Sequence, residues 1–370
     1  MKIALLGDIA FFGKYSIENK SIFEYFRDAS ELLKNYDCVI GNLETPFCNT
    51  SKPFGYKSAH IKAEPENIEI LKYLNVGIVN LSNNHILDYG IKGYEKTKKV
   101  LSDNGIEFFG IDNKQYRVEK NGQKIALSGF CCYSTNALGY YNHKTKKGVN
   151  VLNAFDIEKL LLKNSEEGYF NIVSIHAGQE HVNYPNYDHV EMARLFSDKV
   201  PYIYYGHHPH VLQGIEEENE SLIAYSIGNF CFDDVYTDKS TKPLIEQTKE
   251  NKSSMILSVE IEDNKIVKYN TIPIYLGDSK MEIQSNDEIQ NKISDFSNYL
   301  SLPKEKYIMQ RNIELNSFVE GRKNHRDFNW YIKRINYRSI SLIINSILNK
   351  RKYKQAVKNY LEYYKSIEKH

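Results

Sequence analysis

Short apolar runs alternate with helical patterns along roughly the first three quarters of this 370-residue chain, and that alternation limits its possible folds most strongly. Ile3–Leu6, Cys38–Ile40 and Ile172–Ile175 have the length of buried strands, whereas Ile22–Leu33 and Gly90–Leu101 carry apolar residues at helical spacing. Nearly continuous apolar strands are typical of sheets that helices cover. The chain is therefore predicted to be a layered α/β sandwich with helices flanking central β-sheets.

The remaining elements follow the same pattern. Further strands are predicted at Gly77–Leu81, Ile125–Phe130, Tyr202–Tyr205 and Leu222–Ser226, further helices at Asn67–Leu74 and Tyr187–Phe196, and a closing hairpin at Met255–Glu262 and Ile266–Ile274 around Asp263-Asn264. Beyond about residue 285 the strand patterns stop and helical patterns take over. We therefore divide the chain into a body, residues 1–280, and a C-terminal helical extension, residues 281–370.

Polar side chains follow five of the predicted strands. They are Gly7-Asp8, Gly41-Asn42-Leu43-Glu44, Asn83-Asn84-His85 with Asp88, His176-Ala177-Gly178-Gln179-Glu180 and Gly206-His207-His208-Pro209-His210. In open α/β sheets the carboxyl ends of the strands share one edge, where ligands bind. Taken singly, such an Asp is usually a turn or helix cap and such a His a buried core residue. Five strand ends with the same chemistry favour one shared site.

Carboxylate oxygen, amide oxygen and imidazole nitrogen together suit Mn²⁺, Fe or Zn²⁺. The set holds no thiolate, which argues against a purely structural zinc site. It also offers more ligands than one ion needs. The pattern thus predicts a two-metal hydrolytic centre, in which ions about 3.5–4 Å apart activate a water and hold the substrate oxygens.

The motifs and their order resemble the CapA family of bacterial capsule and poly-γ-glutamate synthesis proteins, which is similar in fold to the calcineurin-like metallophosphoesterases. The matching motifs are Gly7-Asp8, Gly41-Asn42-Leu43-Glu44, Asn83-Asn84-His85 with Asp88-Tyr89-Gly90, His176-x-Gly178-x-Glu180, His208-Pro209-His210-Val211-x-Gln213 and Tyr225-Ser226-x-Gly228-Asn229-Phe230. The resemblance covers roughly residues 1–275 and implies a metallophosphoesterase-like sandwich. It does not cover the extension.

The resemblance also implies the metal ligands. Glu44 stands where the bridging carboxylate would be. Asp8 and His210 would complete the first metal site, and Asn84, His176 and His208 the second. The wider phosphoesterase pattern places a His two residues after the first Asp, but this chain has Ala10 there. The first site then has fewer protein ligands, so the second is expected to fill more readily.

Other residues receive supporting roles from the same resemblance. His85 would act as a general acid or a hydrogen-bond donor in the transition state. Asp88 either fixes the tautomer of His85 or caps the helix at Gly90, and both alternatives stay open. Asn42, Glu180 and Asn229 are expected to line the site or orient its ligands. His181 and His207 are expected to be surface histidines.

These features imply a metal-dependent hydrolase of metallophosphoesterase type acting in capsule or poly-γ-glutamate synthesis on a phosphorylated or polymer substrate. The alternative is a non-catalytic accessory or scaffold protein of a capsule-synthesis complex, whose metal site is structural or binds polymer. Fold and motifs do not decide between an ester and an amide substrate.

Charge divides the chain more sharply than its net value of +1 suggests. Residues 303–370 contain 16 basic and 6 acidic side chains, a net of +10, whereas residues 1–302 contain 32 and 41, a net of −9. The acidic body argues against a nucleic-acid binder that works by bulk positive charge. The tail suits an anionic polymer or a membrane complex, or contact with a second copy of the chain.

Two apolar stripes at helical spacing are predicted within Phe328–Ile367. They are Ile340, Ile343/Ile344, Ile347/Leu348 and then Tyr353, Val357, Tyr360/Leu361, Tyr364. Packing on the body or on another subunit is favoured for both, with the basic face in solvent. The only Trp is Trp330, so no aromatic belt is evident.

A cytoplasmic location is predicted from three features. The five cysteines are scattered and form no C-x-x-C motif, which suits a reducing compartment. Asp8 interrupts the first apolar run too early for a signal peptide. No apolar stretch approaches the roughly 20 residues that span a bilayer.

Overall fold

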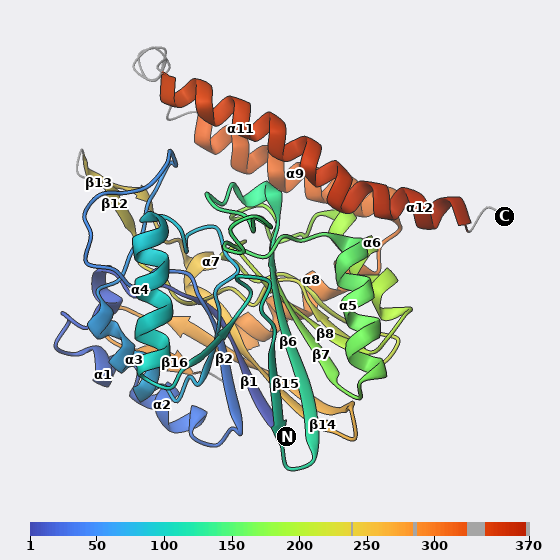
Figure 1. The fold of residues 1–370 in the computed structure, drawn as a ribbon, viewed down its shortest axis with the longest axis horizontal. Coiled ribbons are helices and arrows are strands. Elements are labelled where there is room, and N and C mark those ends of the chain that lie inside the picture. Colours follow the sequence, from blue (N-terminus) through green and yellow to red (C-terminus); the bar gives the residue numbers. More distant parts are fainter. Residues whose placement is uncertain (238–239, 284–286, 324–336, 368–370) are drawn as a thin grey trace.

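A computed structural model describes residues 1–237, 240–283, 287–323 and 337–367. Two sheets form the centre of the molecule (Figure 1). The first has the order β16 (Met281–Ile283), β15 (Lys265–Leu276), β14 (Ser253–Glu262), β1 (Lys2–Ile9), β2 (Cys38–Leu43), β3 (Ile78–Asn80), β4 (Glu107–Phe109), and β11 (Asn229–Cys231) also pairs with β1. The second has the order β5 (Tyr116–Lys120), β6 (Gln123–Cys131), β7 (Phe170–His176), β8 (Tyr202–His207), β10 (Ser221–Ala224), β9 (Ile215–Glu218).

Each sheet contains a block of neighbouring parallel strands, with antiparallel strands on one side of it in the first sheet and on both sides in the second. β1, β2, β3 and β4 are parallel neighbours in the first sheet, as are β6, β7, β8 and β10 in the second. A separate hairpin joins β12 (Val235–Thr237) to β13 (Ser240–Ile245). The predicted hairpin at Asp263-Asn264 is present as β14 and β15, which pair antiparallel.

Helices cover the outer faces of both sheets and lie over one end of the sandwich. They are α1 (Ile22–Tyr25), α2 (Arg27–Leu33), α3 (Ile68–Tyr73), α4 (Gly90–Asp103), α5 (Ala154–Glu166), α6 (Tyr187–Ser197), α7 (Lys249–Lys252), α8 (Asp287–Leu300), α9 (Lys304–Lys323), α11 (Tyr337–Tyr353) and α12 (Asn359–Ile367). Short 3₁₀ turns lie at η1 (Gly13–Tyr15), η2 (Pro65–Asn67) and η3 (Tyr133–Thr135), and a π-helical segment, η4 (Lys354–Lys358), links α11 to α12.

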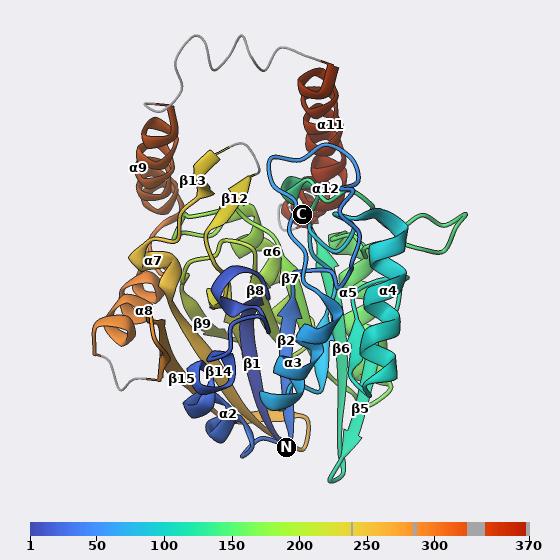
Figure 2. The same ribbon diagram turned by 90° about the vertical axis from the view of Figure 1, so that its left-hand side faces the viewer.

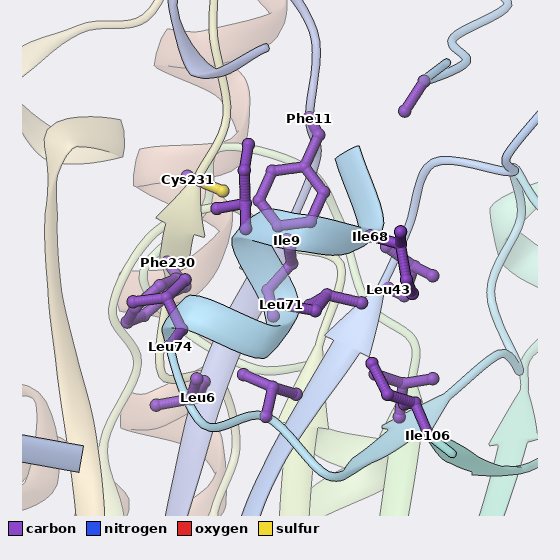
Figure 3. Packing of buried hydrophobic residues seen from close by; sticks show 14 of the residues in the cluster. Leu6, Ile9, Phe11, Leu43, Ile68, Leu71, Leu74, Ile106, Phe230 and Cys231 are labelled. Atoms are coloured by element: carbon purple, nitrogen blue, oxygen red, sulfur yellow. The ribbon is translucent and has the colours of Figure 1, made fainter. Parts of the chain in front are cut away.

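Alternation along β1 shows why the layers form. Ile3 and Leu5 pack between the two sheets with residues of the second sheet such as Ile172. Ala4 and Leu6 point the other way, into the core that lies between the first sheet and helices α1 to α4. Figure 3 shows α3 lying across this second core, with Leu71 among the labelled side chains. Both faces of the strand are buried, and the predicted layered sandwich is confirmed.

The second sheet has its own outer core. Val173 and Ile175 of β7 pack there with Phe196 of α6. Val357 of η4 and Leu361 of α12 belong to the same core, so the end of the chain is part of the outer helical layer. Figures 1 and 2 show α9 and α11 above one end of the sandwich, on the side away from the N-terminus. Strand β1 runs toward this same end.

The predicted elements are present, with shifted ends. The helix predicted at Ile22–Leu33 is divided at Phe26, where the backbone leaves helical geometry (φ −98°, ψ 7°). The predicted division of the chain at residue 280 falls just before β16, which pairs with β15 at the edge of the first sheet. Whether 280 is a domain boundary stays a prediction.

The two stripes of the extension differ in their surroundings. Tyr353, Val357 and Tyr360 pack on the second sheet's helices, as favoured from the sequence. The α11 stripe does not pack on the described body: Ile343 is 60% exposed and Ile347 50%. Phe328 and Trp330 lie outside the described residues. Within the described part of the chain, no helix is both long and apolar enough to cross a membrane.

Candidate metal centre

Strand register brings the predicted ligands to one end of the sandwich. Asp8 near the end of β1 lies beside Asn42 of β2 on one side and Asn229 of β11 on the other. In the second sheet, His176 at the end of β7 is opposite His207 at the end of β8. The loops after β2, β3 and β8 supply the rest of the set, which is Glu44, Asn84, His208 and His210. All of these side chains are buried.

Two groups of side chains could each hold a metal ion, and Glu44 belongs to both. One is Glu44, His176 and His208, and the other is Asp8, Glu44 and His210. Within each group the ligand atoms lie within 4.8 Å of one another. Asn84 Oδ1 lies 2.9 Å from His176 Nε2, so this amide adds a further ligand to the first group.

The surroundings of the Glu44 carboxylate are those of a metal ligand. Neither oxygen has a hydrogen-bond partner among the described residues, although the side chain is fully buried. Oε1 lies 3.8 Å from Nε2 of each of His85, His176 and His210. A buried, unpaired carboxylate is costly unless a positive charge compensates it. Its position and the oxygen and nitrogen donors around it match a divalent ion.

Burial shapes the protonation of the second-site ligands. It lowers the pKa of His208 to about 4 and holds the pKa of His176 well below its usual value. Both rings are therefore neutral near neutral pH, and a neutral imidazole is the form that binds metal. Burial also raises the pKa of the Glu44 carboxyl well above its ordinary value.

His210 behaves differently because it faces two carboxylates. Burial alone would lower its pKa, but Glu44 and Asp8 outweigh burial and raise the pKa to about 10. Burial alone would raise the pKa of Asp8, but His207 and His210 hold it well below its ordinary value. A proton on His210 thus supplies a positive charge between Asp8 and Glu44, and an ion bound there would displace that proton.

Three asparagines hold the ligands in place. Asn42 Nδ2 donates to Asp8 Oδ1 at 2.7 Å, and Asn42 Oδ1 in turn accepts from Asn80 Nδ2 at 2.9 Å. Asn229 Oδ1 accepts from His210 Nδ1 at 2.9 Å, which turns Nε2 of that ring toward Glu44. These contacts match the orienting role, one of the two roles expected of Asn42 and Asn229, and that role stays a prediction.

His85 lies beside the two ligand groups and is fixed from behind. Its Nδ1 is 2.6 Å from Asp88 Oδ2, while Nε2 faces Glu44. Asp88 Oδ2 also accepts from the backbone N–H of Ile61, and Asp88 Oδ1 lies 3.0 Å from Lys57 Nζ. The residue preceding α4 is Tyr89, and no side-chain cap is formed there. Of the two alternatives for Asp88, the contacts are those of a partner of His85.

The two histidines that follow β8 have unusual backbone conformations. His208 has a φ of +94° and His210 a φ of +58°, values that residues other than glycine rarely adopt. Such positions cost on the order of 1–3 kcal/mol each and cluster at functional sites. At Gly7 a Cβ would lie 2.1 Å from Gly228 O, so only glycine lets β11 bring Asn229 this close to Asp8.

The prediction of a surface His207 is wrong. The side chain is buried, and its Nδ1 lies 3.0 Å from Asp8 Oδ1. The reason is strand alternation: Ile203 and Tyr205 of β8 point between the sheets, so His207 points the same way, toward the end of β1. His181 is partly buried, with its Nδ1 2.9 Å from Asn251 Nδ2.

Sequence reasoning missed two further residues at the centre. Lys57 comes from the long segment between β2 and α3 and contacts the backbone oxygen of Asn84, His85 Nδ1 and Asp88. No motif surrounds it, so no pattern could have identified it. Asn83 donates to Leu43 O and accepts from the backbone N–H groups of His85 and Ile86. Its place in the Asn-Asn-His run was the available signal.

A polar cavity of about 580 Å³ opens onto the centre. Asn84, His85 and His208 line its inner end, together with Glu180 and Lys57. The Glu180 side chain therefore borders the space that a substrate would occupy, whereas Asn42 and Asn229 lie behind the ligands.

A layered α/β sandwich that gathers Asp, Glu, Asn and His at the carboxyl ends of its strands defines a candidate two-metal protein. The family model described as "Bacterial capsule synthesis protein PGA_cap" matches residues 2–234, which include every predicted metal ligand. The chain belongs to this family.

Two curated relatives agree with the family. The chain is 30% identical to "PGA biosynthesis protein CapA" of Bacillus subtilis (strain 168) over 66% of this chain and 67% of that protein. It is also 30% identical to "Capsule biosynthesis protein CapA" of Bacillus anthracis over 70% of this chain and 66% of that protein. The matches thus span about two thirds of each relative's length.

Solved structures show a weaker likeness. A putative 5'-nucleotidase from Staphylococcus aureus matches 81% of this chain and 59% of its own, with 12% identity and a TM-score of 0.44. Because that score is below 0.5, the assignment to a family rests on the sequence relatives.

Proposed function

We propose that the protein is a metal-dependent hydrolase of metallophosphoesterase type that acts in capsule or poly-γ-glutamate synthesis. The observation that carries the proposal is the position of Glu44, a buried carboxylate without a hydrogen-bond partner among the described residues and common to both ligand groups. The capsule context comes from the family and from the names of the two Bacillus relatives. The proposal includes a cytoplasmic location.

Asp8, Glu44 and His210 would hold one ion, and Glu44, Asn84, His176 and His208 the other. Divalent ions at such a centre supply Lewis acidity and lower the pKa of water. The second site offers four protein ligands and the first three, so the second should bind its ion more tightly. Mn²⁺, Fe and Zn²⁺ all suit these donors.

The chain's own residues would handle the leaving group. Nε2 of His85 faces Glu44, and Nδ1 faces Asp88. Burial lowers the pKa of His85 despite the raising effect of Asp88. Because Nδ1–H donates to Asp88, donation from Nε2 to the departing oxygen requires the doubly protonated ring. The Asp88 carboxylate favours that charged form against burial and holds the ring in the orientation that allows the transfer.

Hydrolysis of a chromogenic phosphodiester with added Mn²⁺ or Zn²⁺ tests the proposal. Glu44→Gln should abolish activity and reduce bound metal. His85→Ala should retain metal and lower kcat about 100-fold or more, the scale of a lost general acid. His143→Ala is the matched control, because His143 is an exposed histidine away from the metal ligands.

An accessory protein would give a different result. If the wild-type protein binds metal but hydrolyses neither the phosphodiester nor poly-γ-glutamate, and if His85→Ala supports polymer production as well as the wild type does, catalysis at this centre is wrong. The family assignment would remain, and the metal site would then be structural or polymer-binding.

A further inference from the structure

Helix α11 forms the outer wall of the cavity that leads to the metal centre. Asn345, Asn349 and Lys352 of α11 line the same cavity as Asn84 and His85. Asn349 Nδ2 donates to Asn136 Oδ1 at 3.3 Å, just beyond η3. The family model ends at residue 234, so this wall comes from a part of the chain that the family match does not include.

A second cavity, of about 490 Å³, adjoins the first across this contact. Ser134, Asn136 and Asn349 line both cavities. The two spaces therefore meet along the contact between η3 and α11. Together they extend from the metal centre to the start of α6, where Asn186 and Asp188 line the second cavity.

Three lysines line the second cavity at regular spacing. They are Lys350 near the end of α11 and Lys354 and Lys358 at the two ends of η4, each four residues after the last. All three are exposed. One acidic side chain, Asp188, lines the same cavity and lies 3.7 Å from Lys358 Nζ. The lining thus keeps an excess of positive charge.

Lys352 adds a cation where the first cavity reaches α11. Its Nζ lies 5.3 Å from the centre of the Tyr133 ring, so the side chain rests on η3. At the inner end, Lys57 lines the same cavity. Lys57 is paired with Asp88, and Glu180 also lines this cavity, so the excess of positive charge lies toward α11, at Lys352 and in the second cavity.

We propose that these two cavities form one groove for an extended polyanion, and that Lys350, Lys354 and Lys358 hold the part of the polymer that lies outside the metal centre. The inference rests on the proposed function and names the substrate class for that site. A polymer with a carboxylate on every unit, such as poly-γ-glutamate, presents repeated charges to the repeated lysines. A small phosphoester would occupy only the inner end of the groove.

Binding of labelled oligo-γ-glutamate, measured by fluorescence anisotropy at low and at physiological salt, tests the groove. The triple variant Lys350→Gln/Lys354→Gln/Lys358→Gln should raise the Kd about tenfold at low salt, because three exposed ionic contacts to the polymer are lost together. The difference should shrink as salt is added. Affinity for inorganic phosphate should not change.

The matched control is Lys92→Gln/Lys96→Gln/Lys99→Gln on α4, which removes three exposed lysines at similar spacing. It should leave the Kd for the polymer unchanged. An equal loss in both triple variants would mean attraction by net charge alone and would overturn the groove. Wild-type affinity in the α11 triple variant, or no polymer binding by the wild type, would also overturn it.

Two further arms separate polymer binding in the groove from membrane binding and from hydrolysis. Vesicles containing phosphatidylglycerol replace the polymer in one arm: loss of vesicle binding with unchanged polymer binding would assign the lysines to a membrane instead. The other arm repeats the polymer measurement in the Glu44→Gln background, where hydrolysis is absent. Polymer binding by this variant supports the groove even if the proposed hydrolysis fails. Hydrolysis by the wild type without polymer binding overturns the groove but leaves the proposed function in place.

Discussion

Glu44 is the residue on which the centre depends. The loop after β2 places its carboxylate among His85, His176 and His210, with Oε1 3.8 Å from Nε2 of each ring. Burial without a hydrogen-bond donor among the described residues raises its pKa, so a proton or a cation must compensate it. Metal binding should therefore stabilise the folded state as well as supply chemistry.

Lys57 should matter to His85 and Asp88 without binding metal. In Lys57→Met, Asp88 loses its lysine partner and the His85 ring loses a neighbour at 3.1 Å. We expect kcat to fall by about tenfold to a hundredfold, the usual scale for residues that orient a functional histidine. Bound metal, measured by mass spectrometry of the elements, should not change.

Lys62→Met is the control for this variant, because Lys62 lies in the same segment and its ion pair with Glu64 is partly exposed. It should leave kcat within about twofold of the wild type, as expected for a surface pair. An equal fall in both variants would indicate a general loosening of the segment. A Lys57→Met protein with normal kcat would show that His85 needs no support from this lysine.

At the scale of elements, the sequence identified the strands and the residues that follow them, because buried parallel strands leave a clear apolar pattern. The same pattern could have placed His207, which shares a face with Ile203 and Tyr205. Lys57 could not be predicted, since a long irregular segment carries it to His85 by tertiary packing alone. The exposure of the α11 stripe is also a tertiary property, because an amphipathic pattern does not say what covers it.

Helix α6 carries a buried histidine, His189, that is not among the predicted metal ligands. His189 is fully buried, its Nε2 has no partner among the described residues, and burial lowers its pKa to about 4. The unfolded chain takes up a proton below about pH 6.5, and the folded one does so only near pH 4. The folded state should therefore lose stability as pH falls through this window, by up to about 3 kcal/mol in total.

Urea unfolding of chelator-treated protein at pH 7 and pH 5 measures this effect. Between these values the wild type should lose about 2 kcal/mol more than His189→Gln, whose side chain does not titrate. Other histidines titrate in both proteins and cancel in the comparison. Parallel pH profiles for the two proteins would contradict the assignment to His189.

At the scale of the whole molecule, the last helix is a structural part of the sandwich. Tyr360 is fully buried, its ring packs on Phe155 and Phe196, and its hydroxyl donates to Glu158 at 2.6 Å. Tyr360→Ala should lower the free energy of unfolding by about 3 kcal/mol, as large-to-small changes in a core do. Chemical denaturation at constant metal concentration measures it.

Tyr363→Ala is the comparison, because Tyr363 lies on the same helix and is 51% exposed. Its cost should stay within about 1 kcal/mol. If both variants are equally stable, α12 does not pack on the second sheet's helices. The basic extension would then be a separate appendage and not a layer of the fold.

Charge is also arranged over the whole molecule. The body is acidic and contains the ligand carboxylates, while residues 303–370 carry a net charge of +10. The basic helices lie above the same end of the sandwich as the metal centre (Figures 1 and 2). An anionic substrate would therefore approach that end through positive potential.

Anomalous X-ray diffraction from crystals soaked in limiting Mn²⁺ tests the central claim most directly. Two peaks are expected on either side of the Glu44 carboxylate, and the peak beside Asn84, His176 and His208 should be the stronger. Two equal peaks at limiting Mn²⁺ would contradict the unequal sites that Ala10 predicts. No peak, or a single peak that Glu44 does not contact, would contradict the two-metal centre itself.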